Sequence, residues 1–168
     1  VAVDVRLARS QRRRHPLHLG LGLVALGLGL LGARLKIIDC IAEEIDYYTV
    51  FKMMQDFKPT WVVFNPISST VTYDMIIAHF GKSLGAKTVA ISPHTKALRE
   101  ESLGRYKSLD YAVDYTKGGT EPEYNLRELI HGIAAKGTKL EDLPPARQDL
   151  LPIAKYSLPF IGRSYTFI

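Results

Sequence analysis

Residues 61–70, Trp-Val-Val-Phe-Asn-Pro-Ile-Ser-Ser-Thr, limit the possible folds of this chain more than any other stretch. Trp61–Asn65 is a short run of strand-forming residues, apolar on both faces, as expected for a strand inside a parallel sheet. Pro66 ends the run because proline cannot donate a hydrogen bond to the sheet. The hydroxyl residues Ser68–Thr70 follow, and such residues are favoured where a helix begins because they cap its N–H groups. The stretch therefore predicts a central strand, a turn and the start of a helix.

The rest of the chain alternates predicted strands and helices. Runs of β-formers predict strands at Val1–Val5, Leu35–Cys40, Lys87–Ser92 and Asp110–Tyr115. Helical spacing of apolar residues predicts helices over Glu43–Phe57, Thr72–Leu84, Ala97–Tyr106 and Glu123–Ile133. In the second of these helices the predicted apolar stripe is Ile76, Ile77, Phe80 and Leu84. Short connections between such elements require right-handed crossovers, so we expect an α/β fold with a doubly wound parallel sheet of about five strands.

Length and cysteine content restrict the class of protein. A chain of 168 residues is long enough for one domain whose core needs neither disulfides nor metals. Cys40 is the single cysteine, so the chain has no internal disulfide and no multi-cysteine metal site. We expect Cys40 to be a half-buried residue at a strand end. A solitary cysteine also fits a reducing compartment, and the expected location is the cytoplasm.

The net charge of +5 resides in residues 1–34, which contain six arginines and one acid. Residues 35–168 contain 16 basic and 16 acidic residues and are therefore neutral. A protein that binds the phosphate backbone of DNA or RNA needs a basic excess, so we expect no nucleic-acid partner.

Residues 1–34 are also unusual in composition, with leucine and glycine concentrated in Leu17–Gly32. Three hypotheses are open: a signal or membrane anchor after Arg12–Arg14, the first helix of the domain, or a miscalled or frame-shifted start. Five glycines in the run weaken the anchor hypothesis, because glycine disfavours a helix. The second and third hypotheses are preferred, and no membrane anchor is expected.

The chain changes character again from residue 137. Leu140–Pro152 is interrupted by prolines, which prevent a long regular element, and is interpreted as a linker. Ser164–Ile168 is strand-like and has no predicted partner strand. The sequence is thus divided into an atypical segment at 1–34, an α/β domain at 35–136, and a linker with the first strand of a missing domain at 137–168.

Short motifs distributed over Leu35–Ile168 point to a known family. They are Lys36–Asp39, Lys58-Pro59, Pro93-His94, Ala97-Leu98 with Glu100-Glu101, Asp110–Val113 and Glu121–Leu129. The most specific segment is the linker sequence Leu143–Pro152. Together they resemble the amino-terminal cobalamin-binding domain of radical S-adenosylmethionine enzymes, in particular the group of the anaerobic magnesium-protoporphyrin IX monomethyl ester cyclase.

This resemblance implies a flavodoxin-like, Rossmann-like domain that holds cobalamin for a downstream radical S-adenosylmethionine barrel in the same polypeptide. The complete enzyme would be a methyltransferase or an oxidative cyclase. Its 4Fe-4S cluster and S-adenosylmethionine would bind in the missing domain. This chain would supply no catalytic residue and no metal ligand. We expect no axial histidine on cobalt, because no histidine has an aspartate two positions before it.

Three loops after predicted strands carry hydroxyls, small residues and backbone N–H groups, which suit the amide-bearing corrin ring. Open α/β sheets bind ligands beyond the carboxyl ends of their strands. The candidate cofactor-binding residues are Asp39, Pro66, Ser68, Ser69, Thr70, Ser92, Pro93, His94, Thr95, Tyr115, Gly118 and Gly119.

Less specific interpretations remain open for several of these residues. Ser68–Thr70 could form only a helix cap, Asp39 could cap the following helix, and His94 could bond to a nearby carbonyl. Asp74 and the Glu100-Glu101 pair are interpreted as solvated helix acids.

Two other classes of function also remain open: a non-catalytic flavodoxin-like regulatory module and a flavin mononucleotide domain. A phospho-acceptor receiver is disfavoured, because Asn65 and Pro66 stand where its aspartate belongs. The arginine-rich segment after the first strand does not resemble a flavin phosphate loop.

Overall fold

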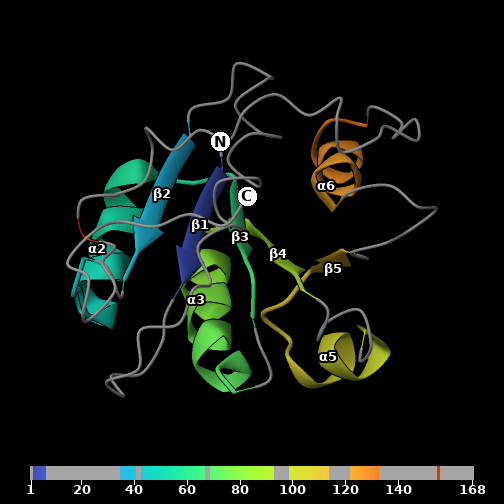
Figure 1. Cartoon of the computed structure of the whole chain (residues 1–168), viewed down its shortest axis with the longest axis horizontal. Coiled ribbons are helices and arrows are strands. Elements are labelled where there is room, and N and C mark those ends of the chain that lie inside the picture. Colours follow the sequence, from blue (N-terminus) through green and yellow to red (C-terminus); the bar gives the residue numbers. More distant parts are fainter. Residues whose placement is uncertain are drawn as a thin grey trace, which may run out of the picture.

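The computed structural model describes residues 2–6, 35–40, 43–66, 69–92, 99–113, 122–132 and 155. Within these ranges one sheet contains the strands β1 (Ala2–Arg6), β2 (Leu35–Asp39), β3 (Trp61–Phe64), β4 (Lys87–Ile91) and β5 (Tyr111–Val113). Their order across the sheet is β2-β1-β3-β4-β5, and all neighbouring strands are parallel (Figure 1). The predicted α/β class with a parallel sheet is confirmed.

β3 lies in the middle of the sheet, as the sequence predicts. Trp61 is in register with Ala2 of β1 on one side and with Lys87 of β4 on the other. All four residues of β3 are buried, which explains why the strand is apolar on both faces. The strand ends at Phe64, one residue before the predicted boundary at Asn65.

The helices of the described residues are α2 (Tyr47–Phe57), α3 (Val71–Ser83), α5 (Arg99–Arg105) and α6 (Pro122–His131). α2 begins at Tyr47 and not at Glu43, because Asp46 is its N-cap and accepts a 2.8 Å hydrogen bond from the Thr49 N–H. Glu44 has a φ of 54°, which is left-handed and incompatible with a continuing helix.

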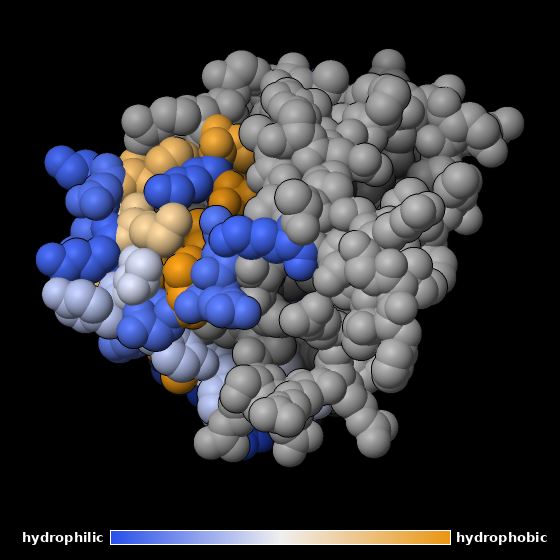
Figure 2. Space-filling view, turned by 60° about the vertical axis from the view of Figure 1, so that its left-hand side comes forward, coloured by the Kyte–Doolittle hydropathy of each residue, from blue (hydrophilic) through white to orange (hydrophobic). Residues whose placement is uncertain are grey.

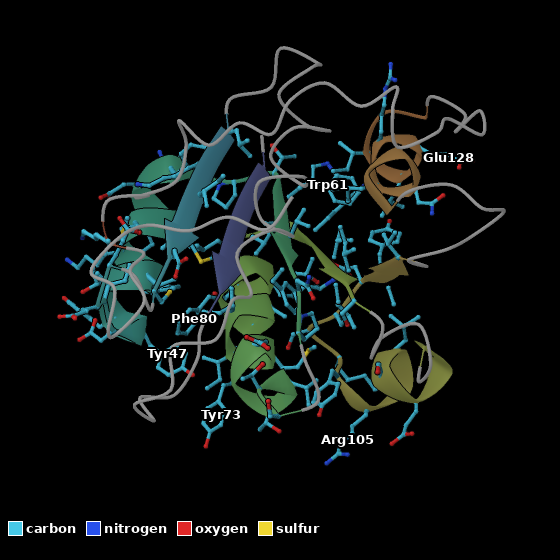
Figure 3. All side chains as sticks on the ribbon, in the orientation of Figure 1. Tyr47, Trp61, Tyr73, Phe80, Arg105 and Glu128 are labelled. Atoms are coloured by element: carbon cyan, nitrogen blue, oxygen red, sulfur yellow. The ribbon has the colours of Figure 1, made fainter. Side chains whose placement is uncertain are left out.

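Side chains of β3 alternate between two hydrophobic clusters on opposite faces of the sheet. Val62 belongs to the cluster that includes buried residues of α2 and α3, and α5 adds Leu103 to this cluster. Val63 belongs to the cluster that includes Leu126 of α6. The described helices therefore lie on both faces of the sheet. Figure 3 shows Tyr47 near Phe80 on the side of α2 and α3.

The buried face of α3 differs from the predicted stripe. Its buried residues are Asp74, Met75, Ile77, Ala78 and Gly81. Of the predicted set only Ile77 is buried, whereas Ile76, Phe80 and Leu84 are partly exposed. A Cβ atom on Gly81 would lie 2.9 Å from Cγ2 of Val62. Gly81 thus lets α3 approach the sheet closely, while Phe80 and Leu84 pack against the core cluster that contains Met75 and Ile77.

The remaining boundaries agree with the sequence to within a few residues where they can be compared. The predicted linker Leu140–Pro152 and the predicted strand Ser164–Ile168 lie outside the described residues. No helix in the described part of the chain is long and apolar enough to cross a membrane. Among the described residues that Figure 2 presents, polar side chains are interspersed with apolar ones.

Candidate functional site

The carboxyl ends of the parallel strands share one edge of the sheet, which we call the carboxyl edge (Figure 1, toward which the arrowheads point). Predicted site residues follow three strands there: Asp39 ends β2, Pro66, Ser69 and Thr70 follow β3, and Ser92 follows β4. The other predicted site residues lie outside the described part of the chain; they are Ser68, Pro93, His94, Thr95, Tyr115, Gly118 and Gly119.

Asp39 is almost completely buried, with a relative exposure of 1%. Its backbone N–H donates a 3.2 Å hydrogen bond to Oε2 of Glu43, and the Glu43 N–H donates a 2.9 Å bond back to the Asp39 carbonyl. This reciprocal pair closes the turn after β2. Because Asp46 caps α2, the alternative prediction that Asp39 caps the following helix is wrong.

Cys40 lies directly after β2 and is buried, not half-buried as the sequence suggested. Burial raises the pKa of its thiol far above the ordinary value, and the neighbouring charges of Asp39, Glu43 and, more weakly, Asp74 raise it further. All three acidic residues therefore act in the same direction as burial on this thiol. Cys40 is therefore held as a neutral thiol and is not an activated nucleophile.

The start of α3 is built around Thr70 and Asp74. Thr70 is the N-cap residue, but its side chain makes no capping hydrogen bond. Instead its hydroxyl donates a 2.6 Å hydrogen bond to Oδ2 of Asp74. Asp74 has a relative exposure of only 2%, so its interpretation as a solvated helix acid is wrong. The predicted cap at Ser68–Thr70 is therefore right in position, since Thr70 is the N-cap residue, but the Thr70 hydroxyl satisfies a buried carboxylate and caps no N–H group.

The three other described candidates differ in exposure. Ser69 is exposed at the carboxyl edge. Ser92, at the end of β4, is completely buried, and Pro66 is also buried. Ser69 can therefore contact a ligand directly, whereas Ser92 and Pro66 support the edge from within.

Negative charge dominates the β2 and α3 part of this edge. Helix N-termini usually attract phosphate through their N–H groups and dipole. Here Asp39 ends β2, Glu43 follows in the next turn, and Asp74 lies in the first turn of α3, so negative charge at this edge would oppose a phosphate group. The arrangement instead suits neutral groups that donate hydrogen bonds, such as carboxamides. In the described residues no group of three or more His, Cys, Asp or Glu side chains could hold a metal ion.

A second polar network lies at the other end of the strands, where β4 and β5 begin, and has a structural role. The Asp110 carboxylate pairs with Lys82 of α3 and accepts a 3.0 Å hydrogen bond from the Thr88 N–H of β4. Burial acts to raise the pKa of Asp110, but the bonds and charge from Lys82 and Thr88 outweigh it and hold the pKa below its usual value. The network ties α3 and β4 to the start of β5.

Sequence reasoning missed Asp74 and Glu43 as parts of the carboxyl edge. A signal for Asp74 was present, because Thr70 and Asp74 are four residues apart and so lie on one side of a helix. Asp74 also precedes the buried Ile77 and Ala78 by helical spacing. For Glu43 there was no comparable signal, since its role depends on a turn whose backbone the sequence does not specify.

Comparisons with known proteins add no relationship at this point. No protein-family model matches the chain, and no curated protein or solved structure matches it significantly.

Proposed function

We propose that this chain is a cobalamin-binding, flavodoxin-like domain of a radical S-adenosylmethionine enzyme of the methyltransferase or oxidative cyclase type. In this proposal the chain holds the corrinoid, and a downstream barrel in the same polypeptide binds the 4Fe-4S cluster and S-adenosylmethionine. The cofactor would supply methyl-group transfer or assist ring formation. The proposed compartment is the cytoplasm.

The strand order supports the flavodoxin-like part of the proposal. The order β2-β1-β3-β4-β5 matches the 2-1-3-4-5 arrangement of doubly wound sheets of the flavodoxin type. Helices α2, α3 and α5 pack into one cluster and α6 into the other, which fits winding on both faces. Sheets of this type bind their ligands where the strand order reverses, between β1 and β3.

One observation carries the choice of ligand: the start of α3, which follows β3, combines the hydroxyls of Ser69 and Thr70 with the buried carboxylate of Asp74. Ser69 is exposed, and the Thr70 hydroxyl directs its proton to the buried Asp74, so its oxygen is polarised as an acceptor. The corrin ring carries neutral carboxamides, whose N–H groups can donate to such oxygens. Ser69 and Thr70 are therefore the described residues that would hold the ring edge.

The same observation disfavours flavin mononucleotide at this position. Its phosphate carries negative charge, and the carboxylates of Asp39, Glu43 and Asp74 would oppose it. Cobalamin also carries one phosphate, in its nucleotide tail. The proposal therefore assigns the corrin amides, and not the tail, to the start of α3.

Gel filtration of the full chain after incubation with separate ligands tests this proposal. The ligands are hydroxocobalamin, dicyanocobinamide, which lacks the nucleotide tail, and flavin mononucleotide. We expect both corrinoids to elute with the protein and flavin mononucleotide to elute as free ligand. Retention of flavin mononucleotide alone, or of no ligand, would contradict the proposal.

A matched pair of variants locates the bound corrinoid. Ser69→Leu places a bulky group at the exposed hydroxyl, whereas Ser83→Leu changes an exposed serine at the other end of α3. We expect only the first change to weaken corrinoid retention. Equal retention by both variants would place the ligand elsewhere.

A further inference from the structure

We draw no further inference here: the strongest candidate, the group of acidic residues around the buried Cys40 beside the start of α3, belongs to the site already described, and nothing in the described residues points to a second ligand there.

Discussion

The Thr70 hydroxyl donates a 2.6 Å hydrogen bond to Oδ2 of Asp74, one turn further along α3. The bond is directed into the protein, because Asp74 has a relative exposure of 2%. It replaces the side-chain cap that a threonine at this position usually provides. The start of α3 therefore stabilises a buried carboxylate at the expense of its own capping.

Replacing Thr70 by valine tests the contribution of this bond to stability. Valine keeps the shape of the side chain but cannot donate to Asp74. We expect Thr70→Val to lower the free energy of unfolding by about 1.5–3 kcal/mol, as for loss of a hydrogen bond to a charged group. Thr72→Val, an exposed change in the same first turn, should change it much less. Urea denaturation of both variants measures the difference, and equal effects would show that the bond contributes nothing.

Asp110 predicts a specific dependence of stability on pH. Its pKa is lower in the folded protein than in the unfolded chain, so its contribution is complete above the unfolded pKa of about 3.9 and is lost as the pH falls through the folded value. At pH 7, Asp110→Asn should lower the free energy of unfolding by about 1 kcal/mol, the difference between a charge-assisted and a neutral hydrogen bond.

The difference between wild type and Asp110→Asn should shrink as the pH is lowered below about 4. Asp56→Asn, an exposed change on α2, is the control and should change the free energy of unfolding little at any of these pH values. Urea denaturation at several pH values between 3 and 7 gives the comparison. A difference that is independent of pH would exclude a role for the Asp110 charge.

Gly81 and Gly104 should respond to alanine in opposite directions. A Cβ at Gly81 would lie 2.9 Å from Val62 Cγ2 and 3.1 Å from Thr88 Cγ2, so Gly81→Ala requires α3 or the side chains of the sheet to shift. Such overpacking costs about 1–3 kcal/mol. A Cβ at Gly104 in α5 meets no atom within 4 Å, and alanine is the better helix former by up to about 1 kcal/mol. A higher melting temperature for Gly81→Ala than for Gly104→Ala would contradict the close packing of α3 against the sheet.

Cys40 should react slowly while the chain is folded. Its thiol is buried, and its raised pKa leaves little thiolate at neutral pH. We expect alkylation by iodoacetamide at pH 7.5 to be at least about tenfold slower in buffer than in denaturing urea, because one pKa unit changes the thiolate fraction about tenfold. Mass spectrometry of quenched samples gives both rates. Equal rates would mean that Cys40 is not buried in the folded chain.

Much of the fold was predictable because the pattern of apolar residues in an element agrees with the buried position of that element in the fold. Trp61–Phe64 is apolar on both faces and is buried at the centre of the sheet. The predicted stripe of α3 was right for Ile77, Phe80 and Leu84, which lie in or against the core, but it missed Met75, Ala78 and Gly81, because the sequence does not show how closely a helix approaches a sheet. Gly81 permits that approach, and Asp74, Met75, Ile77 and Ala78 are buried on the same helix.

The candidate site was less predictable than the fold. The sequence indicates which residues follow each strand, and thus places Asp39, Ser69 and Ser92 at one edge. It does not indicate which of their side chains reach solvent. Ser92 is buried and Ser69 is exposed, although both are serines after a buried strand. Exposure here depends on packing between elements that are distant in the sequence.

Binding of a corrinoid is the central claim, and a spectroscopic titration of the full chain tests it most directly. Dicyanocobinamide should bind saturably, and Ser69→Leu should weaken binding at least about tenfold, which corresponds to 1.4 kcal/mol. Ser83→Leu should bind as wild type does, and circular dichroism should show that both variants are folded. Absence of saturable binding by the wild-type chain, or identical affinity of Ser69→Leu and wild type, would contradict the account.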